Sequence, residues 1–169
     1  MDIFPISLKL QQQPCLIVGG GHIAYRKALL LQKAGAIIHV IAPEIEESLL
    51  RIVQNSQGHY VQAAFHPEVA LRPYRLVIAA TDDAETNRQV FELCEAENVL
   101  VNSVDDPPHC RFMVPAIIDR SPLVISVASN GTSPVLSRQI RTQLETTIPH
   151  GMGKLAEFSG KWRSAVKAK

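Results

Sequence analysis

Three consecutive glycines, Gly19–Gly21, stand between an apolar run and a segment with helical spacing, in the text CLIVGGGHIA. Glycine inside a strand or a helix costs about 1 kcal/mol relative to alanine, so a cluster at this junction needs a structural reason. The pattern Gly19-x-Gly21-x-x-Ala24 fits a turn in which the first glycine bends the chain and the second lets a pyrophosphate approach the backbone. Free N–H groups at the start of a helix favour the same anion. The glycines alone leave open a tight turn without any ligand.

Apolar runs of strand length alternate with amphipathic segments of helix length through the first two thirds of the chain. The expected strands are 15–18, 37–41, 60–65, 76–80 and 99–104, and the expected helices are 23–34, 44–55 and 84–97. Continuous apolar strands separated by amphipathic helices are typical of a parallel sheet that is covered on both faces. We therefore expect an α/β domain with a Rossmann-like, doubly wound parallel sheet.

The pattern changes after residue 111. The text RFMVPAIIDRSPLVISVAS contains two apolar runs joined by a connection too short for a parallel crossover, which predicts an antiparallel hairpin. Ser133 as a cap and Pro134 at the first helical position then predict a helix through Thr147, and a last helical stretch follows it. The expected parts are a nucleotide-binding domain at 1–111, a hairpin-helix module at 112–148 and the start of a C-terminal helical segment at 149–169.

Composition excludes several classes of protein. With 46% hydrophobic residues, 20% charged residues and a net charge of +1, the 169-residue chain can bury a core but has no overall basic surface for nucleic acid. Three widely spaced cysteines suggest no disulfide framework and favour a reducing, cytoplasmic location. The N-terminus lacks the features of a signal peptide, and no apolar run approaches the ~20 residues that span a bilayer. We expect a soluble protein with no nucleic-acid or membrane partner.

Two positions beyond the glycines are candidates for contact with a dinucleotide. Thr81 follows the strand expected at 76–80, at the edge of the sheet where ligands bind. The alternative for this stretch is a cap on the next helix, formed by Asp82 or Asp83, and both roles are compatible. Glu44 is the nearest acid after the second strand and either holds the ribose or occupies the first turn of a helix. No arginine or lysine follows this strand immediately, which favours NAD over NADP.

Four longer stretches carry a family resemblance. They are, in chain order, CLIVGGGHIAYRKALLLQKAGA, LVIAATDDAETN, VNSVDDP and FMVPAIIDRSPLVISVASNGTSPVLSRQIR, and the C-terminal helix matches the family as well. The chain resembles the siroheme synthase family, in its precorrin-2 dehydrogenase/sirohydrochlorin ferrochelatase part, along nearly its whole length. The resemblance implies an enzyme that oxidises precorrin-2 to sirohydrochlorin with NAD⁺ and that, as in many members, inserts Fe²⁺ at the same site. It also implies a homodimer in which residues 112–148 form the dimerisation module and the substrate cleft uses both chains.

Two departures from the family pattern limit these expectations. The text DPPHC after Asp105 differs between relatives. The chain is also too short for the S-adenosylmethionine-dependent methyltransferase domain that many relatives carry, so synthesis of precorrin-2 itself is not expected.

The resemblance also assigns site residues. The family's essential aspartate falls on Asp105, and nucleotide contacts fall on His22, Ile23, Pro43 and Glu44. Dehydrogenation and metal insertion both need a proton acceptor at the ring, and one carboxylate can serve both. The residues alone leave open that Asp105 is an ordinary turn residue.

Next to this aspartate, His109 is a minor candidate for proton transfer and Cys110 is expected to be structural. A histidine and a cysteine alone fall short of the three or four ligands of a permanent metal site, so no resident metal is expected.

Precorrin-2 carries eight carboxylates, so its binding site should be locally basic despite the nearly neutral chain. The candidate substrate-binding residues are Asn102, Arg111, Arg120, Ser129 and Arg138. For any one arginine, a solvated surface position is an equal alternative, and the loop around Ser129 is alternatively only the turn that reaches the helix cap at Ser133. Two rival functions remain: a non-catalytic NAD-binding regulatory module, and a chelatase without dehydrogenase activity.

Overall fold

The computed structural model describes residues 2–167, without the side chains of residues 164, 165 and 167. The chain forms two compact units. The first, Pro5–Phe112, is called the sheet unit below. The second contains residues 2–4 and 113–167 and is called the hairpin unit.

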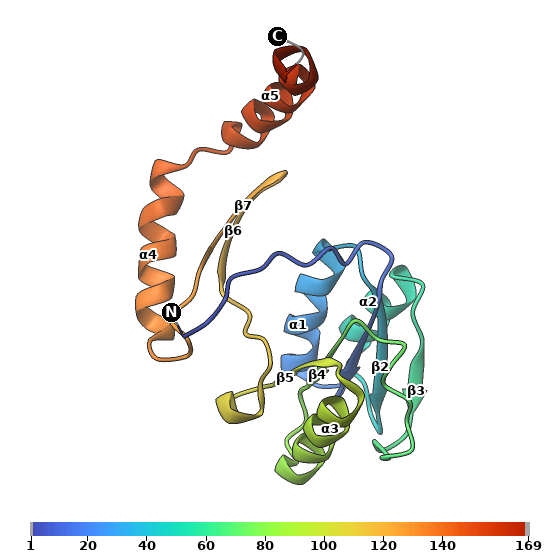
Figure 1. Ribbon diagram of the computed structural model, residues 1–169. Helices are drawn as coiled ribbons and strands as arrows, with labels where there is room; N and C mark the ends of the chain where they lie inside the picture. The colour runs from blue at the N-terminus through green and yellow to red at the C-terminus, as the bar shows by residue number, and fades with distance from the viewer. Residues whose placement is uncertain (1, 168–169) are drawn as a thin grey trace. The chain divides into compact units, whose positions relative to one another are not determined.

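A five-stranded parallel sheet forms the centre of the sheet unit (Figure 1). Its strands are β1 (Pro14–Val18), β2 (Ile37–Ala42), β3 (Tyr60–Gln62), β4 (Leu76–Ala79) and β5 (Leu100–Ser103). They lie in the order β3-β2-β1-β4-β5, and every neighbouring pair is parallel. From β1 the chain continues to β2 and β3 on one side of the sheet, and from β4 it continues to β5 on the other. The strand order therefore reverses between β1 and β4, and ligands of open parallel sheets bind at such a reversal, beyond the carboxyl ends of the strands.

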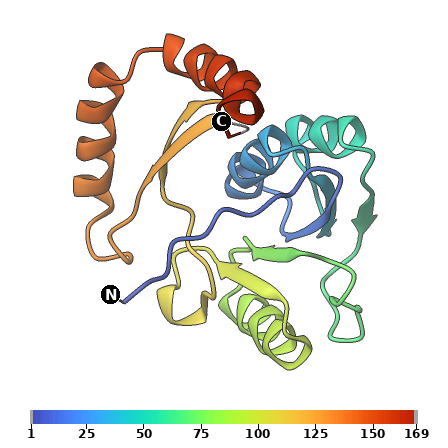
Figure 2. The ribbon, with the colours of Figure 1, turned by 45° about the horizontal axis from the view of Figure 1, so that its top comes forward.

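Helices cover both faces of this sheet. Helices α1 (His22–Lys33) and α2 (Glu47–Asn55) lie side by side on one face, and α3 (Ala84–Glu97) covers the other (Figure 2). Alternate residues of β1 separate the two cores, since Ile17 packs in the core with α1 and α2 whereas Leu16 packs in the core with α3. The predicted doubly wound α/β fold is confirmed.

Two predicted boundaries in the sheet unit are wrong. Helix α2 begins at Glu47 rather than at Glu44, because the main chain first passes over the glycine loop, where the Glu46 N–H donates a hydrogen bond to the Gly20 carbonyl at 2.8 Å. Strand β3 ends at Gln62 rather than at residue 65. Glu44 therefore lies in a loop and not in the first turn of a helix.

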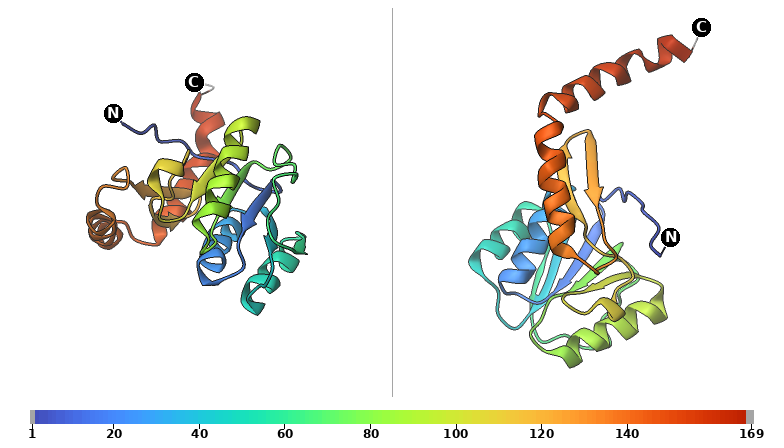
Figure 3. Two further views of the ribbon diagram at one scale, coloured as in Figure 1. Left: turned by 90° about the horizontal axis from the view of Figure 1, so that it is seen from below. Right: turned by 90° about the vertical axis from the view of Figure 1, so that its left-hand side faces the viewer.

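The hairpin unit contains the predicted antiparallel pair, β6 (Ala116–Arg120) and β7 (Leu123–Val127). Helix α4 (Pro134–Thr147) lies along this hairpin, and α5 (Gly151–Lys167) follows it (Figure 3). The hydroxyl of Ser133 accepts a hydrogen bond from the Leu136 N–H at 3.4 Å, so both ends predicted for α4 are confirmed. No helix in the described part of the chain is long and apolar enough to cross a membrane.

Candidate functional site

A cleft of about 730 Å³ opens in the sheet unit beyond the carboxyl ends of β1, β2 and β4. It is lined by residues 18–23 of the glycine loop, by residues 41–44 after β2, by Ala64 and Phe65, and by residues 80–83 with Thr86. The cleft brings together all of the residues predicted to bind the dinucleotide: Gly19, Gly21, His22, Ile23, Pro43, Glu44 and Thr81.

The three glycines of the loop have different structural roles. A Cβ atom at Gly19, where φ is +122°, would lie 2.2 Å from the Ala80 carbonyl oxygen, and one at Gly20 would lie 1.8 Å from the Glu44 carbonyl oxygen. A Cβ atom at Gly21 would meet nothing within 4 Å. The fold itself therefore requires the first two glycines, whereas the third leaves open space beside the start of α1.

The start of α1 suits an anion. Gly21 is its N-cap residue, no side chain caps this end, and the first turn holds no acidic residue. The first N–H groups of a helix have no partner within the helix, and they carry a partial positive charge. The exposed imidazole of His22 lies beside these groups, 4.0 Å from a Glu46 carboxylate oxygen. The residues present therefore fit a pyrophosphate.

Thr81 is fixed at the edge of the cleft by the next helix. Its hydroxyl donates a hydrogen bond to the Asn87 side-chain oxygen at 2.8 Å, and the Asn87 amide donates to the Thr81 carbonyl at 2.9 Å. Asp83, rather than Thr81, caps α3 by accepting from the N–H groups of Glu85 and Thr86. Hydrogen bonds from the Thr86 side chain and from the α3 backbone hold the pKa of Asp83 below its usual value. Thr81 and Asp83 both line the cleft, and Asp83 also caps α3.

Asp105 lies in a tightly folded loop after β5. The thiol of Cys110 donates to the Ser103 carbonyl at 3.1 Å, which closes the loop back on the end of the strand. Burial raises the pKa of this thiol. Asp105 itself has φ of +59° and is exposed, at a position where aspartate and asparagine are better tolerated than other non-glycine residues. Its carboxylate is therefore available at the carboxyl edge of the sheet and is not buried in the core.

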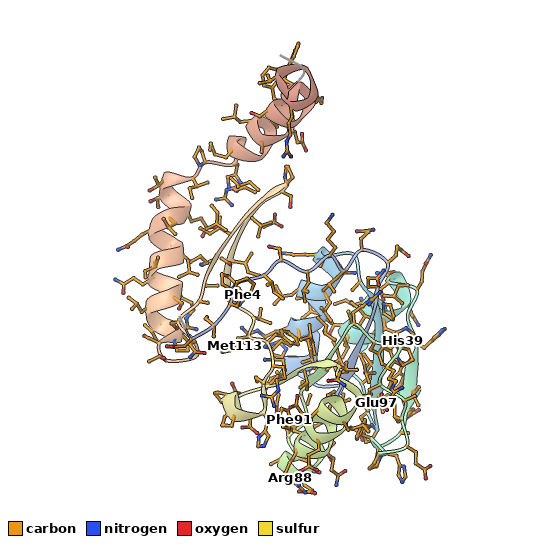
Figure 4. All side chains as sticks on the ribbon, viewed as in Figure 1. Phe4, His39, Arg88, Phe91, Glu97 and Met113 are labelled. Atoms are coloured by element: carbon orange, nitrogen blue, oxygen red, sulfur yellow. The ribbon has the colours of Figure 1, made fainter. Side chains whose placement is uncertain are left out.

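A second carboxylate follows directly and has a partner. A carboxylate oxygen of Asp106 lies 2.7 Å from Nδ1 of His109, whose ring packs edge-on against Phe91 at 4.8 Å between centroids. Phe91 lies on α3, where it is labelled in Figure 4. Within the described residues, no group of three histidine, cysteine, aspartate or glutamate side chains could hold a metal ion.

Lys27, on α1, was not among the predicted site residues. Its ammonium group donates a hydrogen bond to the Asn102 side-chain oxygen at 3.4 Å, and it lies close enough to Asp105 for their charges to interact. Burial lowers the pKa of Lys27, and the charge of Asp105 partly opposes this effect. One signal was present in the sequence: Lys27 follows Ala24 by three residues and precedes Leu31 by four, so it shares their buried face of the helix.

Asn102, one of the predicted substrate residues, lies three residues before Asp105 in the sequence. It is buried at the end of β5, and its amide donates to the Phe112 carbonyl at 3.0 Å. Arg111 instead forms an ion pair with Glu95 and stacks over the Phe91 ring.

The other three predicted substrate residues belong to the hairpin unit. Arg120 is buried there, donates to the Ile148 carbonyl at 3.2 Å and lies 3.7 Å from Glu145. The Ser129 hydroxyl accepts from the Ser133 N–H at 3.2 Å, and Arg138 is exposed on α4. The partners of Arg120 lie inside its own unit, and its role in substrate binding stays a prediction.

The strand order, the glycine loop at the switch point and the open N-terminus of α1 together define a dinucleotide-binding domain of the Rossmann type. In agreement, residues 6–116 match the model of a family described as putative NAD(P)-binding, and the chain belongs to this family.

Similarity to curated proteins extends over nearly the whole chain. The chain is 69% identical to siroheme synthase of Acinetobacter baylyi over 168 residues, which are 99% of this chain and 37% of the relative. It is 50% identical to siroheme synthase of Chromobacterium violaceum over 169 residues, all of this chain and 36% of the relative. The predicted resemblance is confirmed, and the chain spans little more than a third of the length of these relatives.

A solved structure of SirC, a precorrin-2 dehydrogenase, shares the fold of the chain. The TM-score is 0.80 at 23% sequence identity, over 96% of this chain and 79% of SirC. This likeness includes the hairpin and helices that follow the parallel sheet.

Proposed function

We propose that this chain oxidises precorrin-2 to sirohydrochlorin with NAD⁺ and then inserts Fe²⁺ into sirohydrochlorin at the same site. The observation that carries the proposal is the 69% identity to a siroheme synthase along 99% of the chain. Two features of the structure support it: a cleft suited to a dinucleotide and an exposed carboxylate, Asp105, at the carboxyl edge of the same sheet.

The residues of the cleft bind and orient the cofactor. Backbone N–H groups at the start of α1 bind the pyrophosphate, which occupies the open space at Gly21. Glu44 accepts hydrogen bonds from the ribose hydroxyls. Thr81, held by Asn87, would contact the cofactor at the edge of the sheet. When bound, NAD⁺ supplies the acceptor for the hydride that leaves the ring.

Asp105 acts as the proton acceptor in both reactions. In the oxidation, a ring carbon of precorrin-2 loses a hydride and a neighbouring position loses a proton, which the carboxylate takes. In the metal insertion, the ionised carboxylate first attracts Fe²⁺, which replaces two N–H protons of the ring; the carboxylate accepts one of these protons and water takes the other. An exposed carboxylate returns its proton to water between the two steps.

The chelatase half of the proposal has a direct test. Sirohydrochlorin, the protein and Fe²⁺ are mixed without NAD⁺, and the absorbance change on metal insertion is followed against the rate without protein. We expect the wild-type chain to accelerate insertion. A rate equal to that of the protein-free mixture would contradict this half of the proposal.

We expect the chain to prefer NAD⁺ to NADP⁺ by about 10-fold or more in dissociation constant, equivalent to about 1.4 kcal/mol. The 2′-phosphate of NADP⁺ would approach the Glu44 carboxylate, and no lysine or arginine is among the cleft-lining residues of the described chain. Titration of each nucleotide into the protein measures the preference, and Glu44→Gln should reduce it. Equal affinities for the two nucleotides in the wild-type chain would contradict this assignment of Glu44.

We further propose that the chain functions in the cytoplasm as a homodimer formed through the hairpin unit. Large apolar side chains of this unit are exposed, and exposed apolar patches mark interaction surfaces. They include Val124, Val135, Leu136, Leu155, Phe158 and Trp162. Analytical ultracentrifugation should give the mass of two chains for the wild type and of one chain for Val124→Asp combined with Leu136→Asp. A monomeric wild type at micromolar concentration would contradict the dimer.

A further inference from the structure

Lys27 is a half-buried lysine beside the proposed catalytic aspartate, and the reactions described above do not use it. Its neighbours Ala24, Ala28 and Leu31 on the same helix face are buried, so its side chain extends from the interior toward the end of β5. It does not line the dinucleotide cleft. The position therefore belongs to the Asp105 side of the sheet unit and not to the cofactor side.

The positive charge of Lys27 is incompletely compensated by the protein. An ammonium group has three N–H donors. In the described chain, its only hydrogen bond is the one to the neutral Asn102 side-chain oxygen, at a long 3.4 Å. Asp105 and the Cys110 thiol are near enough to act on it electrostatically, but burial is the larger effect. A half-buried ammonium group has lost hydrogen bonds to water, and an anionic ligand replaces them with charge-assisted hydrogen bonds.

We propose that Lys27 binds one carboxylate of the tetrapyrrole substrate and thereby places the ring beside Asp105. The inference rests on the proposed function, because that function supplies a ligand rich in carboxylates. Two of the arginines expected to bind them have other partners: Arg111 pairs with Glu95, and Arg120 bonds within the hairpin unit. Lys27 is a basic side chain whose charge interacts with that of Asp105.

Steady-state kinetics with three variants test the proposal. Lys27→Met keeps the length of the side chain and removes the charge, and Lys27→Arg keeps the charge. Lys33→Met is the matched control, because it removes one positive charge from an exposed position in the last turn of the same helix. We expect Lys27→Met to raise KM for precorrin-2 by about 10-fold or more. The KM of Lys27→Met for NAD⁺ and its melting temperature should equal those of the wild type. Lys27→Arg should restore most of the affinity for precorrin-2. Lys33→Met should behave like the wild type in all three measurements.

Different results overturn different statements. A wild-type chain that does not oxidise precorrin-2 overturns the proposed function. An active wild type with an unchanged KM for precorrin-2 in Lys27→Met overturns the role of Lys27 alone. A lower kcat at unchanged KM, or an equal rise in KM for both substrates, shows that Lys27 only positions Asn102 or Asp105 and also overturns it. Titration of sirohydrochlorin into each variant, followed by its fluorescence, checks binding without turnover and should show the same 10-fold weakening.

Discussion

Replacing Asp105 with asparagine should lower the rate of precorrin-2 oxidation by about 10²–10⁴-fold, while NAD⁺ still binds. The substitution removes the proton acceptor and keeps the size and the hydrogen-bonding shape of the side chain. Because Asp105 lies outside the cofactor cleft, the dissociation constant for NAD⁺ should be unchanged. Stopped-flow absorbance gives the oxidation rate, and titration of NAD⁺ gives the affinity.

The backbone at Asp105 decides which substitution is informative. With φ of +59°, an alanine here would be strained, whereas asparagine tolerates this conformation. Asp106→Asn is the matched control, because it removes the adjacent carboxylate, which pairs with His109. We expect a much smaller loss in that control. Full oxidation activity in Asp105→Asn would refute the assignment of the base.

Replacing Gly21 with valine should weaken NAD⁺ binding by about 100-fold or more, equivalent to about 2.7 kcal/mol, without unfolding the protein. The backbone of Gly21, with φ of −87°, is open to any residue, and its Cβ position is free of protein atoms. The added side chain would fill the space assigned to the pyrophosphate. Calorimetric titration measures the affinity, and circular dichroism during heating measures the stability.

Gly20→Val is the contrasting variant. A Cβ atom there would lie 1.8 Å from the Glu44 carbonyl oxygen. We therefore expect Gly20→Val to have a lower melting temperature than the wild type even without NAD⁺. An unchanged NAD⁺ affinity in Gly21→Val would show that the phosphates do not bind at the start of α1.

The sequence predicted the parts of the fold that depend on local signals. Helix α4 has both ends where Ser133, Pro134 and the following apolar spacing place them, and α3 has the predicted range of 84–97. The alternation of buried strands and amphipathic helices was sufficient for the parallel sheet, because helical connections between consecutive strands are typical of parallel pairing and cover both faces of the sheet.

Features that depend on contacts between distant residues were not predictable in this way. Glu44 was placed in a helix by its neighbours, but a hydrogen bond between Glu46 and Gly20 holds the chain in a loop there. Arg111 was predicted to bind the substrate, which stays a prediction, but its ion pair with Glu95, sixteen residues earlier, could not be read from the local sequence. Lys27 and Asn102 meet across 75 residues of sequence, and no local pattern connects them.

One measurement tests the central claim most directly, namely that a dinucleotide and a tetrapyrrole react on the sheet unit of this chain. Precorrin-2 and NAD⁺ are mixed with the protein in the absence of air, and the absorbance of NADH and of sirohydrochlorin is recorded together. We predict that one NADH forms for each sirohydrochlorin at a rate proportional to the protein concentration. NAD⁺ binding without any formation of NADH would contradict the claim and would leave a domain that binds the dinucleotide without using it in catalysis.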